Sequence, residues 1–286
     1  MRWDALWIEK DLLPWCPAWF ERLLIRNRKF VIDYDDAVFH NYDMHERAWV
    51  RLLFGKKIAR LAASANAAVC GSEYLLDYVQ KAGVRKSAFV PTVVHAERYA
   101  SQKHGNSDER TSPVRIGWIG TPKTVKYVSH VRAPIEQLMK NTDAQLCLVG
   151  VNEAEALKLP NVECRPWSED TEVSNIYRFD VGIMPLVDSP WERGKCGYKL
   201  IQYMACGKPV IASKVGANTA IVREGIDGFL VESEEEWLQA LLKLCTDGDL
   251  RARMGRSALQ RFRENYSVEK NAPIIHRVLS EVATKA

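Results

Sequence analysis

Residues 188–213, DSPWERGKCGYKLIQYMACGKPVIAS, place a polar loop, a helix and a buried strand in immediate succession. Residues 188–196 contain proline, glycine and alternating charges, so we expect them to be irregular. From Gly197 apolar residues recur at the spacing of one helix face, and Gly207 is expected to end the helix. Residues 209–213 form an apolar run of the kind found in a parallel strand covered on both faces. Such a succession is typical of an α/β fold.

The same stretch also has the features of an anion site. A loop that leads into a helix delivers free backbone N–H groups to the positive end of the helix dipole, and Lys195 and Lys199 flank this helix start. A diphosphate is the natural occupant of such a site. The alternative is an ordinary strand–loop–helix unit whose lysines are solvated, and the spacing alone leaves both interpretations open.

The rest of the chain alternates between strand and helix patterns in two series. The first series has strands at 30–33, 67–70 and 89–91, with helices at 44–66 and 72–81 between them. The polar stretch 101–113 lacks periodicity and is predicted to be an interdomain linker. The second series starts at Val114 and has strands at 114–119, 145–149, 161–164, 179–185, 209–213 and 228–231. The predicted fold class is α/β with two Rossmann-like, doubly wound domains.

Composition limits the partners and the compartment. The net charge of +4 over 286 residues suits an anionic ligand or membrane headgroups but is too small to indicate nucleic acid. The seven cysteines are scattered without metal-ligand spacing, which predicts reduced thiols in a cytoplasmic protein. No signal peptide or membrane-spanning run is recognisable, so we expect a soluble or membrane-peripheral protein.

Residues 1–29 combine four tryptophans with a basic end. One interpretation is a helix packed in the core, with its cations at the C-terminal turn. The other is a peripheral membrane contact, in which the aromatic residues sit at the lipid interface and the cations bind headgroups. Because tryptophan-rich helices usually pack inside a protein, we favour the core helix.

The run GKCGYKLIQYMACGKPVIAS, with SKVGANTAIVREGIDGFLVESEEEW after it, resembles the donor-site core of the retaining GT-B glycosyltransferases of family 4, also called glycosyltransferase group 1. The likeness continues from about residue 114 to 266, and a weaker one runs back to about residue 30. It implies an acceptor-side domain with linker at 1–110, a donor domain at 111–268 and a helix at 269–286 that crosses back. Relatives usually begin with a strand and a glycine-rich loop that do not precede Met1 here, so the resemblance implies a truncated N-terminal domain.

The resemblance also implies a function. Such enzymes transfer a sugar from a nucleotide-diphosphate donor to a hydroxyl of a carbohydrate or glycolipid acceptor, with retention and without a metal cofactor. The sequence has no obvious DxD cation site, since Asp33-Tyr-Asp35 has that spacing only through the end of a strand. We expect a role in surface polysaccharide or glycolipid assembly at the inner face of the membrane, with self-association as a further expectation. A noncatalytic nucleotide-sugar-binding remnant or partner subunit, and an epimerase or hydrolase, are the alternatives.

By resemblance, the turn at Gly120 holds the donor phosphates through an arginine and a lysine. The arginine position corresponds to Thr121, and Lys126 or Lys123 would supply the cation. Arg165 lies in the loop that packs near the nucleobase in relatives. The predicted donor-binding residues are Gly120, Thr121, Lys126, Arg165, Gly194, Cys196, Gly197, Lys199 and Gln202.

Relatives also place two glutamates eight positions apart around the donor loop, at positions that correspond to Gly194 and Gln202. Gln202 can still pair with ribose hydroxyls, because its amide donates and accepts. Gly194 cannot replace a carboxylate, so Glu192 or Asp188 is expected to substitute for it. The predicted catalytic residues are Glu192, Lys195 and His40, the last as an acceptor-side polar group, and no metal ligand is predicted.

Overall fold

The computed structural model describes residues 4–100, 113–151, 159 and 161–284. By their contacts these residues form two compact units. The first contains residues up to 92, residues 188–196 and residues from 271 onward, and the second contains residues 93–187 and 197–270. The predicted linker lies almost wholly outside the described residues. The domain boundaries drawn from the sequence follow the chain rather than its contacts, and they stay predictions.

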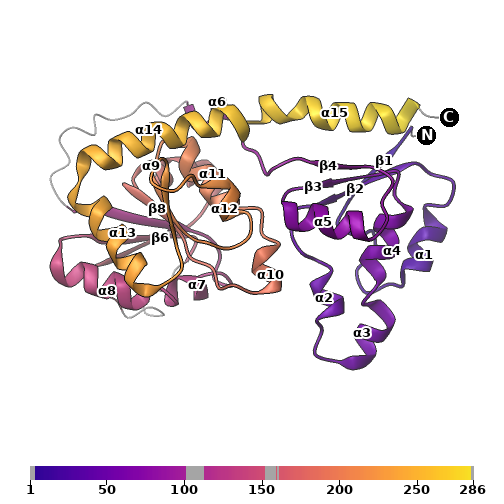
Figure 1. Cartoon of the computed structure of the whole chain (residues 1–286), viewed down its shortest axis with the longest axis horizontal. Helices are drawn as coiled ribbons and strands as arrows, with labels where there is room; N and C mark the ends of the chain where they lie inside the picture. The colour runs from indigo at the N-terminus through magenta and orange to yellow at the C-terminus, as the bar shows by residue number, and fades with distance from the viewer. Residues whose placement is uncertain (1–3, 101–112, 152–158, 160, 285–286) are drawn as a thin grey trace. The chain divides into compact units, whose positions relative to one another are not determined.

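The first unit is built on a parallel sheet in the order β1-β2-β3-β4 (Figure 1). Its strands are β1 (Leu6–Glu9), β2 (Phe30–Tyr34), β3 (Ala67–Cys70) and β4 (Ser87–Phe89). Ile32 and Ala68 point into a core shared with α4 (Lys57–Ser64) and α5 (Glu73–Lys81). Val31 and Val69 face the other way, against α15 (Val268–Thr284). Both faces of the sheet are therefore covered, as the apolar strand patterns predict.

Two helix predictions in this unit are wrong. Residues 44–66 form α3 (Ala48–Phe54) and α4, separated at Gly55 and Lys56, after the short α2 (His40–Asp43). Residues 4–29 contain β1 and only a short helix, α1 (Ala18–Leu24), because the two prolines at positions 14 and 17 interrupt helix formation. The core helix favoured for this segment is also wrong in its packing, since Trp19 is 66% exposed.

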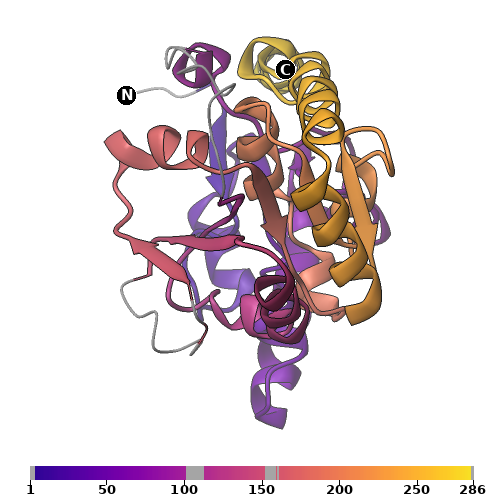
Figure 2. The ribbon, with the colours of Figure 1, turned by 90° about the vertical axis from the view of Figure 1, so that its left-hand side faces the viewer.

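The second unit has a six-stranded parallel sheet in the order β10-β9-β8-β5-β6-β7. Its strands lie within two residues of the predicted runs: β5 (Arg115–Ile119), β6 (Gln145–Val149), β7 (Val162–Arg165), β8 (Val181–Met184), β9 (Val210–Ser213) and β10 (Gly228–Val231). Helices flank both faces (Figures 1 and 2). They are α6 (Ala96–Ala100), α7 (Lys126–Ser129), α8 (Arg132–Asn141), α9 (Glu169–Tyr177), α11 (Tyr198–Ala205), α12 (Asn218–Ile221), α13 (Glu234–Thr246) and α14 (Gly248–Asn265).

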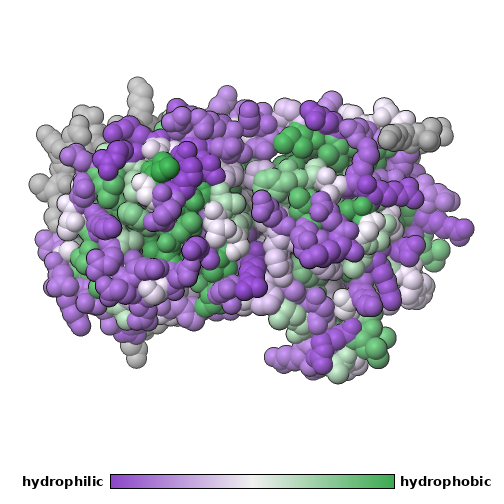
Figure 3. All heavy atoms as spheres, viewed as in Figure 1, coloured by the Kyte–Doolittle hydropathy of each residue, from purple (hydrophilic) through white to green (hydrophobic). Residues whose placement is uncertain are grey.

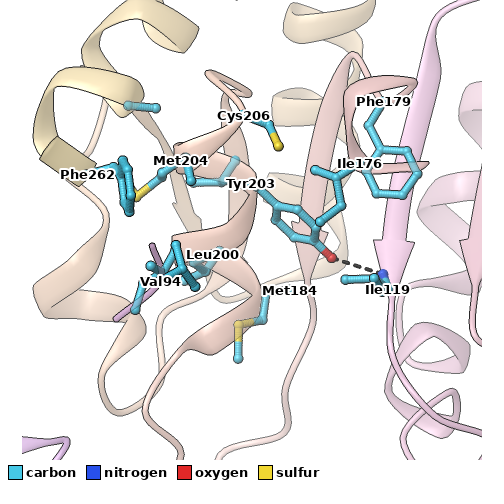
Figure 4. Packing of buried hydrophobic residues seen from close by; sticks show 14 of the residues in the cluster. Val94, Ile119, Ile176, Phe179, Met184, Leu200, Tyr203, Met204, Cys206 and Phe262 are labelled. Carbon is cyan, nitrogen blue, oxygen red and sulfur yellow. Dashed lines mark hydrogen bonds between the residues drawn. The ribbon is translucent and has the colours of Figure 1, made fainter. Parts of the chain in front are cut away.

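Local signals and core packing position these elements. Ser233 and Glu236 form the predicted capping box at the start of α13. Alternate residues of β5 enter different cores, with Trp118 on the α8 and α13 side and Ile119 on the α11 and α14 side. Tyr203 of α11 accepts a hydrogen bond from the Ile119 N–H at 3.0 Å, as Figure 4 shows. This bond ties the helix of the sequence motif to the carboxyl end of β5. Among the described residues, no helix is long and apolar enough to cross a membrane.

Candidate functional site

In the second unit, the turn after β5 lies close to the loop after β6. A Cβ added to Gly150 would lie 2.0 Å from the Gly120 carbonyl oxygen, so the two backbones meet where a side chain cannot enter. Gly150 also has φ +89°, which suits glycine. The Thr124 hydroxyl closes the turn by accepting from the Thr121 N–H at 3.0 Å. Thr121 itself stays exposed, as do Lys123 and Lys126.

The start of α11 brings two predicted donor residues near each other. Lys199 Nζ lies 5.3 Å from the centre of the Trp118 ring, a cation–π distance. A Cβ added to Gly120 would lie 2.3 Å from that same indole, so Trp118 is packed beside both residues. Gly197 begins the helix with φ +71°, and a Cβ there would lie 2.1 Å from the Ile221 side chain. Only glycine therefore fits at the point where the loop becomes the helix.

Gln202 lies in a buried hydrogen-bond network that the sequence did not predict. Its amide donates to the Tyr99 hydroxyl at 3.0 Å, and that hydroxyl donates to Glu172 at 3.1 Å. Glu172 also accepts from the Trp167 indole N–H at 3.0 Å and pairs with Arg98 at 3.4 Å. Burial, the largest influence, raises the pKa of Tyr99, which therefore stays protonated and can donate. The network connects α6, α9 and α11 and holds the half-exposed Trp167 by its ring nitrogen.

Arg165 is the predicted nucleobase-loop residue, and its guanidinium is already engaged. It hydrogen-bonds Glu163 two residues earlier, with Nε 2.7 Å from the carboxylate. Burial alone would raise the pKa of Glu163, but the hydrogen bond and charge of Arg165, together with Cys147 and Arg178, outweigh it, and the pKa falls. A role for this side chain at the donor would use the N–H groups that the pair leaves over, or would require the pair to open.

Residues 188–196 pack within the first unit, where they form a loop around the short helix α10 (Pro190–Arg193). Arg193 forms a bidentate pair with Asp188, at 2.6 and 2.9 Å. The Glu192 carboxylate is buried and accepts a hydrogen bond from the Ser189 hydroxyl. A Cβ added to Gly194 would lie 2.3 Å from the Ala37 Cβ. Packing therefore excludes a glutamate at position 194 in this arrangement of the loop.

The same loop brings Lys195 and Cys196 to the carboxyl end of β2. Lys195 Nζ lies 4.0 Å from Asp36, which is the outer limit of an ion pair. Cys196 is buried, and burial with the nearby Asp35 raises the pKa of its thiol to about 12. The thiol therefore stays neutral and acts as a packing group. It fills the space beside Gly71, where an added Cβ would lie 2.6 Å from the sulfur.

His40 has a protein partner for each ring nitrogen. Nδ1 lies 2.8 Å from Asp43, and Nε2 lies 2.9 Å from the Tyr74 hydroxyl. With a proton on Nδ1, which donates to the carboxylate, Nε2 accepts from the tyrosine. This arrangement suits a structural histidine, and a catalytic role would require the Tyr74 bond to open.

Carboxylates gather at the ends of β1 and β2. Lys10 pairs with Glu9 at 3.3 Å and with Asp35 at 3.1 Å. Burial, followed by the charges of Asp35 and Glu9, raises the pKa of Asp33 to about 6. No group of three or more metal-ligating side chains is found in the part of the chain that the structure describes.

Comparison with known proteins relates this chain to a protein family. The sequence model of the family described as "Glycosyl transferases group 1" matches residues 113–247, which contain the β5 turn and α11. The D-inositol 3-phosphate glycosyltransferase of Corynebacterium jeikeium is 29% identical over 189 residues. These matches relate residues 113–247, just under half of the chain, to the group 1 glycosyltransferases. A putative teichuronic acid biosynthesis glycosyltransferase of Bacillus subtilis is 27% identical over 170 residues.

These relatives are longer proteins than this chain. The matches cover 58% and 54% of this chain but only 43% and 42% of the two relatives. Superposition on solved structures shows that this chain has the GT-B fold. The sucrose-phosphate synthase of Thermosynechococcus elongatus superposes with a TM-score of 0.74 at 17% identity, covering 98% of this chain and 74% of that one. The Anabaena protein HepE, solved with UDP and glucose, gives 0.69 at 17% identity, covering 92% and 74%.

The family match contains every predicted donor residue, together with Glu192 and Lys195. His40 and Asp33 lie outside it. In the structure Lys199 lies beside Gly120, at the carboxyl end of β5, and Gly197 begins the same helix as Lys199. Gly194 and Cys196 pack in the first unit instead. The roles assigned to these residues from the sequence stay predictions. Glu172 and Tyr99 were missed because no spacing in the sequence connects them.

Proposed function

We propose that this chain is a retaining, metal-independent glycosyltransferase of family 4 that moves a hexosyl group from a nucleotide-diphosphate sugar to an acceptor hydroxyl. The observation that carries the proposal is the arrangement in the second unit, where Lys199 and the glycine-led start of α11 lie beside the Gly120 turn. In the proposed site, the backbone N–H groups at that helix start and the Lys199 ammonium would bind a diphosphate. The match of residues 113–247 to the group 1 family supports the same assignment.

The chemistry asked of these residues is positional and electrostatic. A site of this kind must hold the diphosphate and neutralise the charge that grows on it as the sugar leaves. Lys199 and the N–H groups of α11 supply that positive charge without a metal, and the exposed Thr121 adds a hydroxyl. Gln202 would meet the ribose hydroxyls, and its bond to Tyr99 fixes the amide for that contact.

The acceptor, the pathway and the location belong to the same proposal. We infer a carbohydrate or glycolipid acceptor in surface polysaccharide or glycolipid assembly on the cytoplasmic side of the membrane. The curated match to a putative teichuronic acid biosynthesis glycosyltransferase supports the polysaccharide role. Glu192, Lys195 and His40 are proposed as catalytic groups, and substitution of each, with turnover measured, tests those roles.

A noncatalytic nucleotide-sugar-binding protein is the second candidate, and one observation favours it. Gly194 stands where relatives are expected to carry a glutamate, and its contact with Ala37 leaves no room for one. The neighbouring Glu192 is bonded to Ser189, so it would have to move to substitute. Binding of the donor without turnover would identify this candidate. Release of free sugar or an epimer in the absence of an acceptor would identify a hydrolase or an epimerase instead.

The first experiment is a calorimetric titration with UDP, GDP and ADP, followed by sugar nucleotides of the preferred base. We expect one diphosphate to bind at micromolar concentration, and UDP is tested first because the Anabaena neighbour was solved with it. Lys199→Ala should weaken diphosphate binding about tenfold or more, since it removes a charge-assisted contact, while binding of the bare nucleoside changes little. Lys140→Ala, an exposed lysine at the end of α8, is the matched control. Equal losses for diphosphate and nucleoside would exclude the phosphate role, and no binding of any diphosphate would overturn the proposal.

A further inference from the structure

Two short helices of the first unit expose large apolar side chains. On α1, Trp19 is 66% exposed, and on α3, Leu52 is 85% exposed. More than half of the surface of each of four further side chains on or beside these helices is also exposed, namely Leu23, Leu24, Trp49 and Leu53. Single exposed apolar residues are ordinary, but several on neighbouring elements mark an interaction surface.

Trp15 packs the segment before α1 against α3. It lies in the segment just before α1, is itself 54% exposed, and has its ring centre 6.4 Å from that of Phe54 in α3. It also contacts Tyr42 and His45 of the α2–α3 segment, at 5.2 and 5.7 Å. We call the surface formed by Trp15, Trp19, Leu23, Leu24, Trp49, Leu52 and Leu53 the α1–α3 face. In Figure 3, hydrophobic and hydrophilic atoms lie side by side over α3.

The base of this face is fixed. Lys57 is buried, and its ammonium lies 2.6 Å from Asp11, 2.7 Å from Glu21 of α1 and 2.7 Å from the Leu13 carbonyl oxygen. A seven-residue helix such as α1 would not form alone, so these buried contacts hold it in place. The exposed side chains therefore stand on an anchored support.

The basic residues around this face indicate that its binding partner is anionic. The segments 12–31 and 44–63 contain nine lysines and arginines but only two acidic residues, Glu21 and Glu46, of which Glu21 is buried against Lys57. With Asp11, the partner of Lys57, counted as well, their net charge is +6, while that of the whole chain is +4, so the remainder is net negative. Exposed cations lie among or next to the apolar residues of both helices: Arg22, Arg26 and Arg28 at α1, and Arg47, Arg51 and Lys56 at α3.

We propose that the α1–α3 face docks on an anionic lipid surface. Tryptophan and leucine side chains enter the boundary between headgroups and acyl chains, while arginines beside them bind lipid phosphates. Each such cation strengthens association with an anionic surface about fivefold. Interleaved apolar and basic residues on two short helices match a bilayer surface, which offers both kinds of contact everywhere. The inference goes beyond the transfer reaction and does not depend on it.

Flotation of the full chain with vesicles tests the proposal. We expect binding to phosphatidylcholine vesicles that contain phosphatidylglycerol, weakening as salt is raised, and little binding to phosphatidylcholine alone. Leu52→Ser with Leu53→Ser should abolish flotation. Arg22→Gln, Arg26→Gln and Arg28→Gln together should lower the partition coefficient about a hundredfold.

The controls make matched changes in the second unit. Ile226→Ser removes an exposed apolar side chain, and Arg253→Gln, Arg256→Gln and Arg263→Gln remove three exposed charges from α14. These variants should float like the unaltered chain, and thermal unfolding followed by circular dichroism checks that all variants are folded. Equal binding to both vesicle types, or to neither, would overturn the proposal. So would a concentration-dependent dimer that the leucine variant abolishes, since a second copy would then cover the face. UDP titration of the same variants keeps this result separate from the proposed transfer function.

Discussion

At the scale of single residues, packing at Gly194 decides what chemistry the donor loop can offer. Likeness to the family placed a carboxylate at this position, and the sequence by itself shows only that glycine has replaced it. In the structure an added Cβ would lie 2.3 Å from the Ala37 Cβ and 3.1 Å from its nitrogen. The substitution is therefore coupled to a close approach of two backbone segments, and a return to glutamate would require the loop to move.

Gly194→Ala should lower the free energy of unfolding by about 1–3 kcal/mol, because the added methyl overlaps the Ala37 methyl. Ala37→Gly in the same chain removes that methyl and should recover part of the loss, which a double-mutant cycle in urea would measure. If Gly194→Ala unfolds at the same urea concentration as the unaltered chain, the packing argument is wrong.

Asp33 gives the first unit a pH-dependent stability. Burial, with Asp35 and Glu9 nearby, raises its pKa from 3.8 to about 6. Between these values the folded chain binds more protons than the unfolded chain, so stability contributed by this group falls as pH rises from about 4 to 6. Full burial would make the effect about 3 kcal/mol, and solvent screening of this partly exposed carboxyl reduces it to about 1–2 kcal/mol.

Asp33→Asn should remove this decline. The free energy of unfolding of the variant should therefore increase relative to that of the unaltered chain as pH rises from 4 to 6. Urea unfolding at a series of pH values measures the difference, and Asp77→Asn, on the exposed surface of α5, is the control. Parallel pH profiles for Asp33→Asn and the unaltered chain would refute the raised pKa.

At the scale of elements, the sequence predicted regular patterns well and irregular ones poorly. Strands β5 to β10 are apolar runs bounded by turn residues, and each lies where its run predicted. The N-terminal segment was misread because its tryptophans suggested a continuous helix, whereas Trp15 takes φ +63° between two prolines. The break between α3 and α4 was missed because the apolar pattern runs on across it, and the anchoring of α4 depends on Lys57 meeting Asp11 from far away in the chain.

The Glu172 network is the element-scale feature with a direct test. This buried carboxylate accepts hydrogen bonds from Trp167 and Tyr99. In Glu172→Gln, the amide NH₂ would have to face one of those donors. We expect a loss of about 1–3 kcal/mol in unfolding free energy and weaker uridine binding, since Gln202 is held through Tyr99. Urea unfolding and calorimetry measure the two effects.

Glu169→Gln is the matched control, because Glu169 lies on the same helix with its side chain 79% exposed. It should leave both stability and uridine binding nearly unchanged. If Glu172→Gln binds uridine as tightly as the unaltered chain does, the network does not contribute to nucleoside binding and its role is purely structural.

At the scale of the whole molecule, the chain passes between its two units more often than the sequence indicates. Residues 188–196 pack with the first unit, and Gly197, the next residue, begins a helix of the second. Both stretches lie within one continuous motif, so their adjacency in the sequence predicted a single site. The contacts instead assign the two stretches to different units. Gly194 packs against Ala37 and Cys196 against Gly71, and no local pattern reveals partners that distant in the chain.

This division makes a prediction about where a bound nucleotide protects the protein. A ligand at a hundred times its dissociation constant stabilises the bound state by about 2.7 kcal/mol. If the second unit holds the diphosphate, amide exchange should slow in residues 120–124 and in the first turn of α11, while β1 to β4 of the first unit exchange as before. Hydrogen-exchange mass spectrometry with UDP measures this, and Lys199→Ala at the same UDP concentration should show little protection. Protection confined to β1 to β4 would place the nucleotide in the first unit and refute the assignment. Protection that also reaches residues 188–196 would show that Lys195 or Glu192 takes part in binding, as their predicted catalytic roles require.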